Sequence, residues 1–128
     1  MSRATGNPLL NFLGRDPGHR GAHHWRAQRL AALALIPLTL WLVGALAMLP
    51  DLGFATVQAW AATPWRALLL GALVFCSAWH SLLGVQVVIE DYVRGKGAQS
   101  TALAVNAILH VLAGAAGIAA VLVIALKD

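Results

Sequence analysis

Hydrophobic residues along this chain gather into three long stretches that carry no charge. No Asp, Glu, Lys or Arg occurs in residues 30–50, 67–89 or 97–126, which are 21, 23 and 30 residues long. About 20 consecutive apolar residues form a helix that spans the ~30 Å hydrocarbon core of a bilayer. The pattern therefore predicts an all-α membrane protein with three transmembrane helices, at about residues 28–49, 64–92 and 100–126.

Turn-forming residues mark the ends of these predicted helices. Pro50 ends the first helix. The pair Thr63-Pro64 fits the start of the second, with the threonine as N-cap and the proline at the first helical position. Between them we expect a short outer connection, amphipathic at best. Gly95 and Gly97 are expected to break the chain before the third helix.

The polar and Gly-rich beginning of the sequence differs from the rest. Residues 1–24 mix Arg, Gly, His and Pro, and they contain no apolar run of the length found in a cleaved signal peptide. We therefore divide the chain into a cytoplasmic tail, residues 1–24, and a three-helix membrane domain, residues 25–128. Because no Ser-rich transit peptide precedes the first span, we expect a multi-pass protein of a bacterial inner membrane.

Composition and charge support a membrane protein and give it an orientation. Hydrophobic residues make up 59% of the chain and charged residues 11%, whereas a soluble domain carries about 25% charged residues. Basic residues are unevenly distributed: seven lie before the first span or between the second and third, and two lie on the opposite side. By the positive-inside rule, this places the N-terminus in the cytoplasm and the C-terminus in the periplasm. The net charge of +4 is thus a topology signal aided by anionic lipid, and we expect no nucleic-acid partner.

Small residues recur four apart in the third predicted helix. The pairs are Ala113 with Gly117 and Ala116 with Ala120. Such spacing lets two membrane helices approach closely. It predicts packing against another helix without indicating which one.

His80 is the most chemically informative residue in the spans. It lies ten residues from Glu90 at the end of the second span, which is about 15 Å of helix. An ionisable side chain at that depth is costly and often functional, and a neutral imidazole needs a metal, a hydrogen-bond acceptor or water as partner. A hydrogen bond to a neighbouring helix is an equally acceptable explanation. Gly84 and Asp91 fall on the same helical stripe as His80, and the glycine leaves room there for a flat macrocycle.

Asp91 and Tyr92 stand at the membrane edge of the second span. A tyrosine hydroxyl beside a carboxylate can donate a hydrogen bond to a quinone carbonyl and supply a proton. An interfacial cap with an aromatic-belt residue is the alternative, and by itself it is the stronger one.

Together these residues follow the pattern H-x-x-x-G-x-x-x-x-x-x-D-Y at the end of the second of three spans. This arrangement resembles the hydrophobic membrane anchor family of succinate dehydrogenase. The runs GAHHWRAQRL at residues 21–30 and VVIEDYV at residues 87–93 look like the same family. The resemblance covers about residues 21–126, and its three-span topology agrees with the charge distribution.

The resemblance implies cofactors and a role for each matching residue. His80 matches an axial ligand of haem b, whose other ligand is a histidine of a second anchor, the cytochrome b subunit. Tyr92 matches the tyrosine that hydrogen-bonds ubiquinone, and Asp91 the acid near the proton path. Arg29 and His23 match positions near the haem propionates, and Arg29 also lies near the quinone pocket.

The same resemblance implies partners. The expected partners are a flavoprotein subunit, an iron–sulfur subunit and a second three-helix membrane anchor, the cytochrome b subunit, against which this chain packs. The single cysteine cannot ligate an iron–sulfur cluster, so this chain is expected to sit outside the catalytic core of the oxidoreductase. His110, at a depth comparable to His80, is interpreted as a hydrogen-bonding or packing residue, although it could in principle be a second ligand in a self-contained cytochrome.

Three other functions fit parts of the pattern. A fumarate reductase anchor would differ in quinone and in reaction direction, which the sequence does not fix. A purely structural assembly subunit would leave His80 without a ligand. A small transporter would need a polar path across all spans, and the first span offers few residues for one.

Overall fold

Four helices make up the computed structural model of this chain, which describes residues 20–126, with side chains from Trp25 onward. They are α2 (Arg20–Ala47), α3 (Phe54–Ala61), α4 (Pro64–Tyr92) and α5 (Lys96–Ala125). α2 from Trp25 onward, α4 and α5 are each long and apolar enough to cross a membrane. Within the described residues, the prediction of an all-helical fold with three helices long and apolar enough to span a membrane is therefore confirmed.

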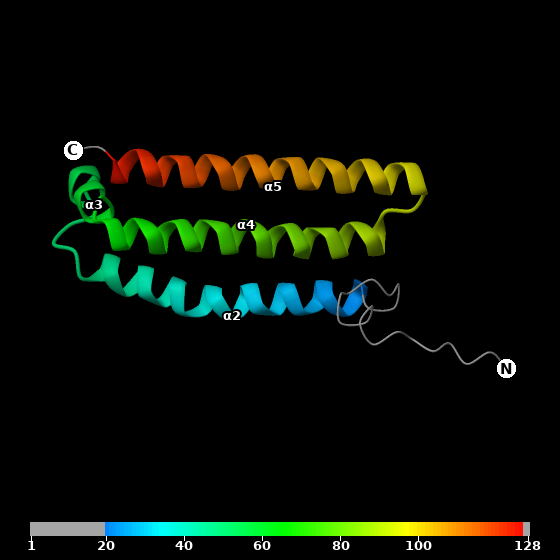
Figure 1. The fold of residues 1–128 in the computed structure, drawn as a ribbon, viewed down its shortest axis with the longest axis horizontal. Helices are drawn as coiled ribbons and strands as arrows, with labels where there is room; N and C mark the ends of the chain where they lie inside the picture. The colour runs from blue at the N-terminus through cyan, green and yellow to red at the C-terminus, as the bar shows by residue number, and fades with distance from the viewer. Residues whose placement is uncertain (1–19, 127–128) are drawn as a thin grey trace, which may run out of the picture.

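The three long helices run side by side, with α4 between α2 and α5 (Figure 1). The first turns of α2, the last turn of α4 and the first turn of α5 all lie at one end of the bundle. The other end carries the short helix α3, which contacts α4 and α5. We name these the Tyr92 end and the Asp51 end, after residues at the two ends of the membrane helices.

Helix bounds differ from the sequence prediction mainly at two starts; α2 also ends at Ala47 rather than near residue 49, and α5 ends at Ala125 rather than near residue 126. α2 begins at Arg20 rather than near residue 28; Arg26 and Ala27, which precede the predicted start, are good helix formers and extend the helix toward its N-terminus. α5 begins at Lys96 rather than near residue 100. Residues 93–95 separate the two helices, and among them Gly95 has a left-handed φ of 98°, a conformation that glycine adopts at no steric cost. Gly97 lies inside the first turn of the helix, and α4 has the bounds 64–92 that were expected.

The outer connection contains a helix that the sequence analysis did not predict. Asp51 starts it: its Oδ1 accepts hydrogen bonds from the backbone N–H of Gly53 at 2.7 Å and from the Thr56 hydroxyl at 2.9 Å. The helix then buries Trp60, which stacks on Trp41 of α2 with ring centroids 5.7 Å apart. α3 therefore packs onto the Asp51 end of the bundle.

Arg66, in the first turn of α4, makes further contacts at the Asp51 end. Its guanidinium lies over the rings of Trp60 and Trp65, at 5.4 and 5.2 Å from the centroids, and its Nη1 donates to the carbonyl oxygen of Trp60 at 3.1 Å. Cation–π contact of this kind stabilises a charge that sits beside apolar surface.

α4 and α5 approach closely because α5 presents glycines to α4. A Cβ atom added to Gly114 would meet Ala78 Cβ at 3.2 Å, and one added to Gly117 would meet Val74 Cγ1 at 2.8 Å. Of the pairs predicted from spacing, only Gly117 packs in this way; the alanines, Ala113, Ala116 and Ala120, are exposed. Helical spacing therefore identified Gly117 correctly but missed Gly114, and the pair Ala116 with Ala120 does not pack against α4.

Little of the described chain is buried. The buried apolar side chains among residues 25–126 are Ala31, Trp60, Ala61, Ala67 and Leu83. Large apolar residues such as Leu40, Leu68 and Val111 are exposed on all three long helices. The surface is thus one that lipid or another hydrophobic protein can cover.

Candidate functional site

His80 lies on the side of α4 that faces α2. Its Nδ1 is 3.3 Å from the backbone carbonyl oxygen of Gln28, 52 residues earlier in the chain. A carbonyl oxygen can only accept, so Nδ1 carries the hydrogen and donates it, and the lone pair is left on Nε2. Within residues 25–126, Nε2 has no hydrogen-bond partner. The imidazole is therefore fixed through one nitrogen and has a free electron pair on the other.

Gly84, one turn from His80, faces the same residue of α2. A Cβ added there would have the Gln28 side-chain nitrogen as its nearest neighbour, at 3.6 Å, which is ordinary van der Waals contact. The two members of the predicted stripe nearest mid-membrane thus share the α2 side of α4. The third, Asp91, lies at the exposed end of the helix.

His110 of α5 has the opposite hydrogen-bonding state from His80. Its Nδ1 lies 2.9 Å from the carbonyl oxygen of Asn106, one turn earlier, and therefore donates. Its Nε2 lies 2.9 Å from the hydroxyl of Ser81 in α4, so the lone pair accepts the Ser81 hydrogen. Both nitrogens are used, which agrees with the interpretation of His110 as a hydrogen-bonding residue between helices.

Asn106 was missed by the sequence analysis. It is the buried polar side chain of the described chain, with 6% of its surface exposed, and its Nδ2 donates to the carbonyl oxygen of Leu82 at 3.1 Å. An amide inside a charge-free span, one turn before a histidine, is the sequence signal that could have found it. Two α4 residues next to His80, Ser81 and Leu82, are therefore hydrogen-bonded to α5.

Asp91 and Tyr92 end α4 in an exposed position. Tyr92 keeps 81% of its surface exposed, and neither side chain has a hydrogen-bond partner among residues 25–126. Beside them, Glu90 is held by two amides: its carboxylate accepts from Gln86 at 2.8 Å and its carbonyl oxygen from Gln99 of α5 at 3.1 Å. The end of α4 is thus fixed to α5, while the phenol and the Asp91 carboxylate are available to a ligand or partner.

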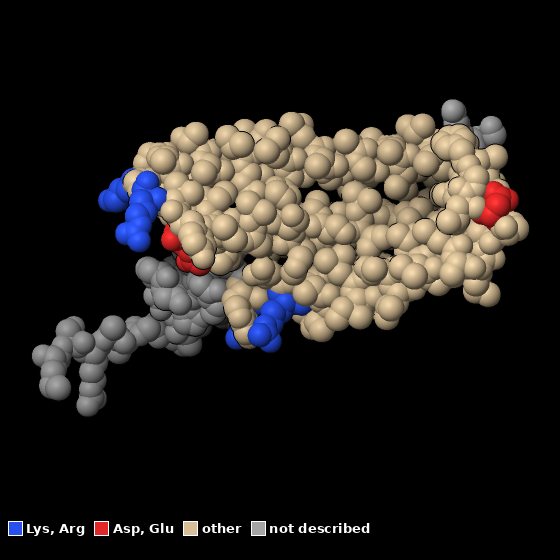
Figure 2. All heavy atoms as spheres, turned by 180° about the vertical axis from the view of Figure 1, so that it is seen from behind, with Lys and Arg blue, Asp and Glu red and all other residues tan. Residues whose placement is uncertain are grey.

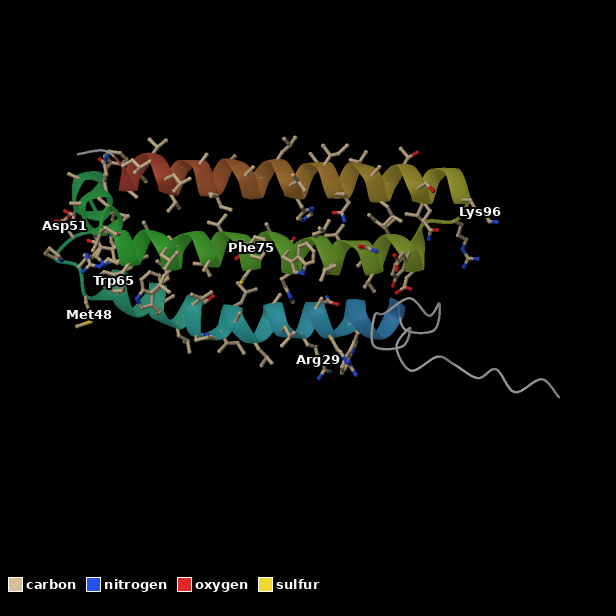
Figure 3. The ribbon with its side chains drawn as sticks, viewed as in Figure 1. Arg29, Met48, Asp51, Trp65, Phe75 and Lys96 are labelled. Atoms are coloured by element: carbon tan, nitrogen blue, oxygen red, sulfur yellow. The ribbon has the colours of Figure 1, made fainter. Side chains whose placement is uncertain are left out.

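Basic side chains gather at the Tyr92 end of the bundle (Figure 2). Arg29 and Lys96 lie toward this end, and Asp51 and Trp65 lie at the other (Figure 3). The Arg29 guanidinium covers the ring of Trp25, 4.2 Å from its centroid. The predicted site residue His23 lies in the first turns of α2, where its side chain is outside the described residues.

Similarity to known proteins bears on what this arrangement does. The model of the succinate dehydrogenase/fumarate reductase transmembrane subunit family matches residues 6–124. The chain belongs to this family. Membership confirms the resemblance carried by the motif from His80 to Tyr92, and it agrees with the three long apolar helices.

Three individual proteins that are similar to this chain share one name. The succinate dehydrogenase hydrophobic membrane anchor subunit of Rickettsia bellii is 31% identical over 102 residues, covering 79% of this chain and 81% of that protein. The subunit of the same name from Rickettsia typhi is 29% identical over 101 residues, with the same coverage of both chains. That of Rickettsia conorii is 31% identical over 74 residues, 57% of this chain and 59% of its own.

Proposed function

We propose that this chain is a membrane anchor subunit of a succinate:quinone oxidoreductase. The family, the names of its relatives and the exposed apolar faces of its three helices support this role. In that complex it holds a flavoprotein subunit and an iron–sulfur subunit at the bilayer. A second three-helix anchor, the cytochrome b subunit, covers part of the surface that this chain leaves exposed.

The proposed orientation puts the Tyr92 end at the cytoplasmic face of a bacterial inner membrane. Arg29 and Lys96 lie toward this end (Figure 3), as do Arg26 in the first turns of α2 and Arg94 in the α4–α5 connection, whereas Arg66 lies in the first turn of α4, at the other end. Positive charge is retained on the cytoplasmic side during insertion. The N-terminus is then cytoplasmic, the C-terminus is periplasmic, and the helix end that carries the tyrosine faces the side on which the soluble subunits dock.

His80 is the proposed axial ligand of haem b, and the free Nε2 is the observation that carries this assignment. Histidines that bind metals through one nitrogen usually donate the other N–H to a carbonyl or carboxylate, which fixes the tautomer and the ring orientation. The bond from Nδ1 to the Gln28 carbonyl oxygen has this form. Gly84 lies on the same side of α4 and adds no side chain beside the imidazole; the nearest atom to an added Cβ would be the Gln28 side-chain nitrogen, at 3.6 Å.

The second axial ligand is assigned to the partner anchor. His110 uses both ring nitrogens inside this chain, so ligation would cost it the hydrogen bond from Ser81. Bound haem b supplies a one-electron carrier, and the surrounding protein tunes its potential through the ligands and burial. Arg29 retains guanidinium donors that can meet a haem propionate; His23 is proposed for the same vicinity from the resemblance alone.

Ubiquinone is the proposed electron acceptor at the Tyr92 end. The exposed Tyr92 hydroxyl can donate a hydrogen bond to a quinone carbonyl oxygen, and the neighbouring Asp91 carboxylate can pass protons to it. Because Gln99 fixes the last turn of α4, both groups stand on a rigid helix end. The site is completed by other subunits.

Co-purification tests the proposed function. An affinity tag on this chain should bring down a flavoprotein, an iron–sulfur protein and a second three-span anchor from solubilised membranes, with succinate-dependent ubiquinone reduction. Loss of the gene should release succinate oxidation activity from the membrane into the soluble fraction. Membrane-bound activity that survives without this chain would contradict the proposal, and preferential reduction of fumarate by a low-potential quinol would favour the fumarate reductase alternative.

A further inference from the structure

The face of α4 opposite its contact with α2 is tied to α5 by polar groups immediately after His80. Ser81 donates its hydroxyl hydrogen to His110 Nε2 at 2.9 Å, and the carbonyl oxygen of Leu82 accepts from Asn106 Nδ2 at 3.1 Å. We call Ser81, Asn106 and His110 the α4–α5 clamp. Its two bonds join consecutive residues of α4 to two residues one turn apart on α5.

Each hydrogen in the clamp has a defined place. The Asn106 carbonyl oxygen takes the hydrogen of His110 Nδ1 at 2.9 Å, which leaves the lone pair on Nε2 for Ser81. Asn106 Nδ2 is a donor and the Leu82 carbonyl oxygen is an acceptor, so this second bond has one direction only. Because each donor has one acceptor, the two bonds between the helices form together at only one rotation of α4 relative to α5.

Packing alone does not require these polar groups. Gly114 against Ala78 and Gly117 against Val74 already bring α5 close to α4, toward the Asp51 end of the helices. Burying an amide in an apolar environment costs free energy unless it is hydrogen-bonded, and leucine would fill similar space without that cost. The clamp lies at the level of His80, where the helix must also present an imidazole.

We propose that Ser81, Asn106 and His110 are positioning residues for the haem ligand. The clamp fixes α4 from the α5 side, and the bond from His80 Nδ1 to Gln28 fixes it from the α2 side. Together they set the rotation of α4 and so the plane in which His80 presents Nε2. This inference rests on the proposed ligation of haem by His80, which shares no hydrogen bond with the three clamp residues.

The test compares matched substitutions at one position in the purified complex. Ser81→Ala removes the hydrogen-bond donor, and Ser81→Thr keeps it. Ser77→Ala removes a hydroxyl one turn away that makes no hydrogen bond within the described residues, and so controls for loss of a serine in α4. The readouts are haem content, the lowest-field g value of the oxidised haem, which reports the orientation of the axial imidazoles, and the haem midpoint potential.

Ser81→Ala should keep its haem but change the g value and shift the potential. We expect up to about a tenfold change in the ratio of oxidised to reduced haem at a fixed poise, which is about 59 mV for a one-electron couple. Ser81→Thr and Ser77→Ala should match the wild type. Asn106→Leu should change the same two readouts in the same direction. If the Asn106→Leu complex does not assemble, the comparison of Ser81→Ala with Ser81→Thr is the test.

Failure of this inference differs from failure of the proposed function. If the complex contains haem that His80→Leu removes, but Ser81→Ala leaves g value and potential as in the wild type, the clamp does not position the ligand. If His80→Leu leaves the haem spectrum unchanged, the ligand assignment itself is wrong. An equal shift in Ser81→Ala and Ser77→Ala would also overturn the inference, because it would show an effect of hydroxyl loss unrelated to α5.

Discussion

On the α5 side of α4, glycines allow close approach, and three side-chain hydrogen bonds join the helices, from Ser81, Gln99 and Asn106. On the α2 side, one side-chain hydrogen bond within the described residues joins the helices, from His80 to the Gln28 carbonyl oxygen. The histidines on the two sides differ in the same way: His110 uses both ring nitrogens, and His80 uses one.

This difference indicates on which side of α4 the polar side chains find all their hydrogen-bond partners within the described residues. The α4–α5 interface satisfies its own polar groups and needs no further component. Among the described residues, the α2–α4 interface leaves the His80 Nε2 lone pair without a hydrogen-bond partner, beside a glycine. A neutral imidazole lone pair at membrane depth is costly to leave unpaired. A metal-ligand role would use that lone pair on the α2 side, whereas the α5 side requires no such role.

Gly84→Leu should have the largest effect on the α2 side. The leucine would press on the Gln28 side chain beside His80, and overpacking of this kind costs about 1–3 kcal/mol, which is roughly fivefold to 150-fold in haem affinity. Haem content per complex measures it. Gly71→Leu, at a glycine with no atom within 4 Å of an added Cβ, is the control; equal haem loss in both variants would remove the distinction between the two positions.

Gly117→Ala should act on the α5 side instead. An added Cβ would lie 2.8 Å from Val74 Cγ1, and a helical valine has little rotamer freedom with which to move away. We expect the complex to lose about 1–3 kcal/mol of stability, with a lower thermal midpoint and unchanged haem content at low temperature. Gly71→Ala should leave the midpoint at or above that of the wild type. A Gly117→Ala complex as stable as wild type would show that α4 and α5 are not closely packed in the membrane.

Tyr92→Phe should lower activity at the proposed quinone site without changing either helix interface. Loss of one hydrogen bond of about 1.4 kcal/mol lowers ubiquinone reduction roughly tenfold. Succinate oxidation with an artificial acceptor should be unchanged, as should haem content, because the exposed Tyr92 side chain joins neither helix interface through a hydrogen bond within the described residues. Equal loss of both activities would point to an assembly defect rather than to quinone binding.

Arg29→Gln should have the smallest effect on stability. The stack of Arg29 on Trp25 is exposed, and such contacts contribute about 0.5–1 kcal/mol. If the guanidinium also meets a haem propionate, the haem potential should shift in Arg29→Gln and be restored in Arg29→Lys, which keeps the charge. A potential that is identical in all three proteins would place Arg29 at the lipid interface only.

Sequence patterns predicted the spans but not the contacts between them. Charge-free stretches located all three helices, because the cost of burying charge in lipid acts on each span separately. Depth likewise singled out His80. The donor–acceptor partners of His80 and His110 depend on how α4 is rotated toward α2 and α5, which spacing along one helix does not specify. For the same reason spacing found Gly117 but paired it with the exposed Ala113 rather than with Gly114.

Two structural features, Asn106 and the start of α3, had signals in the sequence. Asn106 is a lone amide in an apolar span and could have been found by the same cost argument that identified His80. α3 was predicted to be a connection because eight residues are too few for a periodic signal. Asp51 two residues before Gly53 was the available sign of its start. The proposed quinone and haem roles rest on family likeness as well as geometry.

The most direct test of the central claim is the reduced-minus-oxidised absorption spectrum of two variants prepared side by side. His80→Leu should lack the b-type haem signal, because no other imidazole on the α2 side of α4 within the described residues can replace its Nε2. His110→Leu should keep the full signal, since His110 uses both nitrogens within the protein. A full haem signal in His80→Leu, or its loss in His110→Leu alone, would contradict the assignment of the ligand to the α2 side.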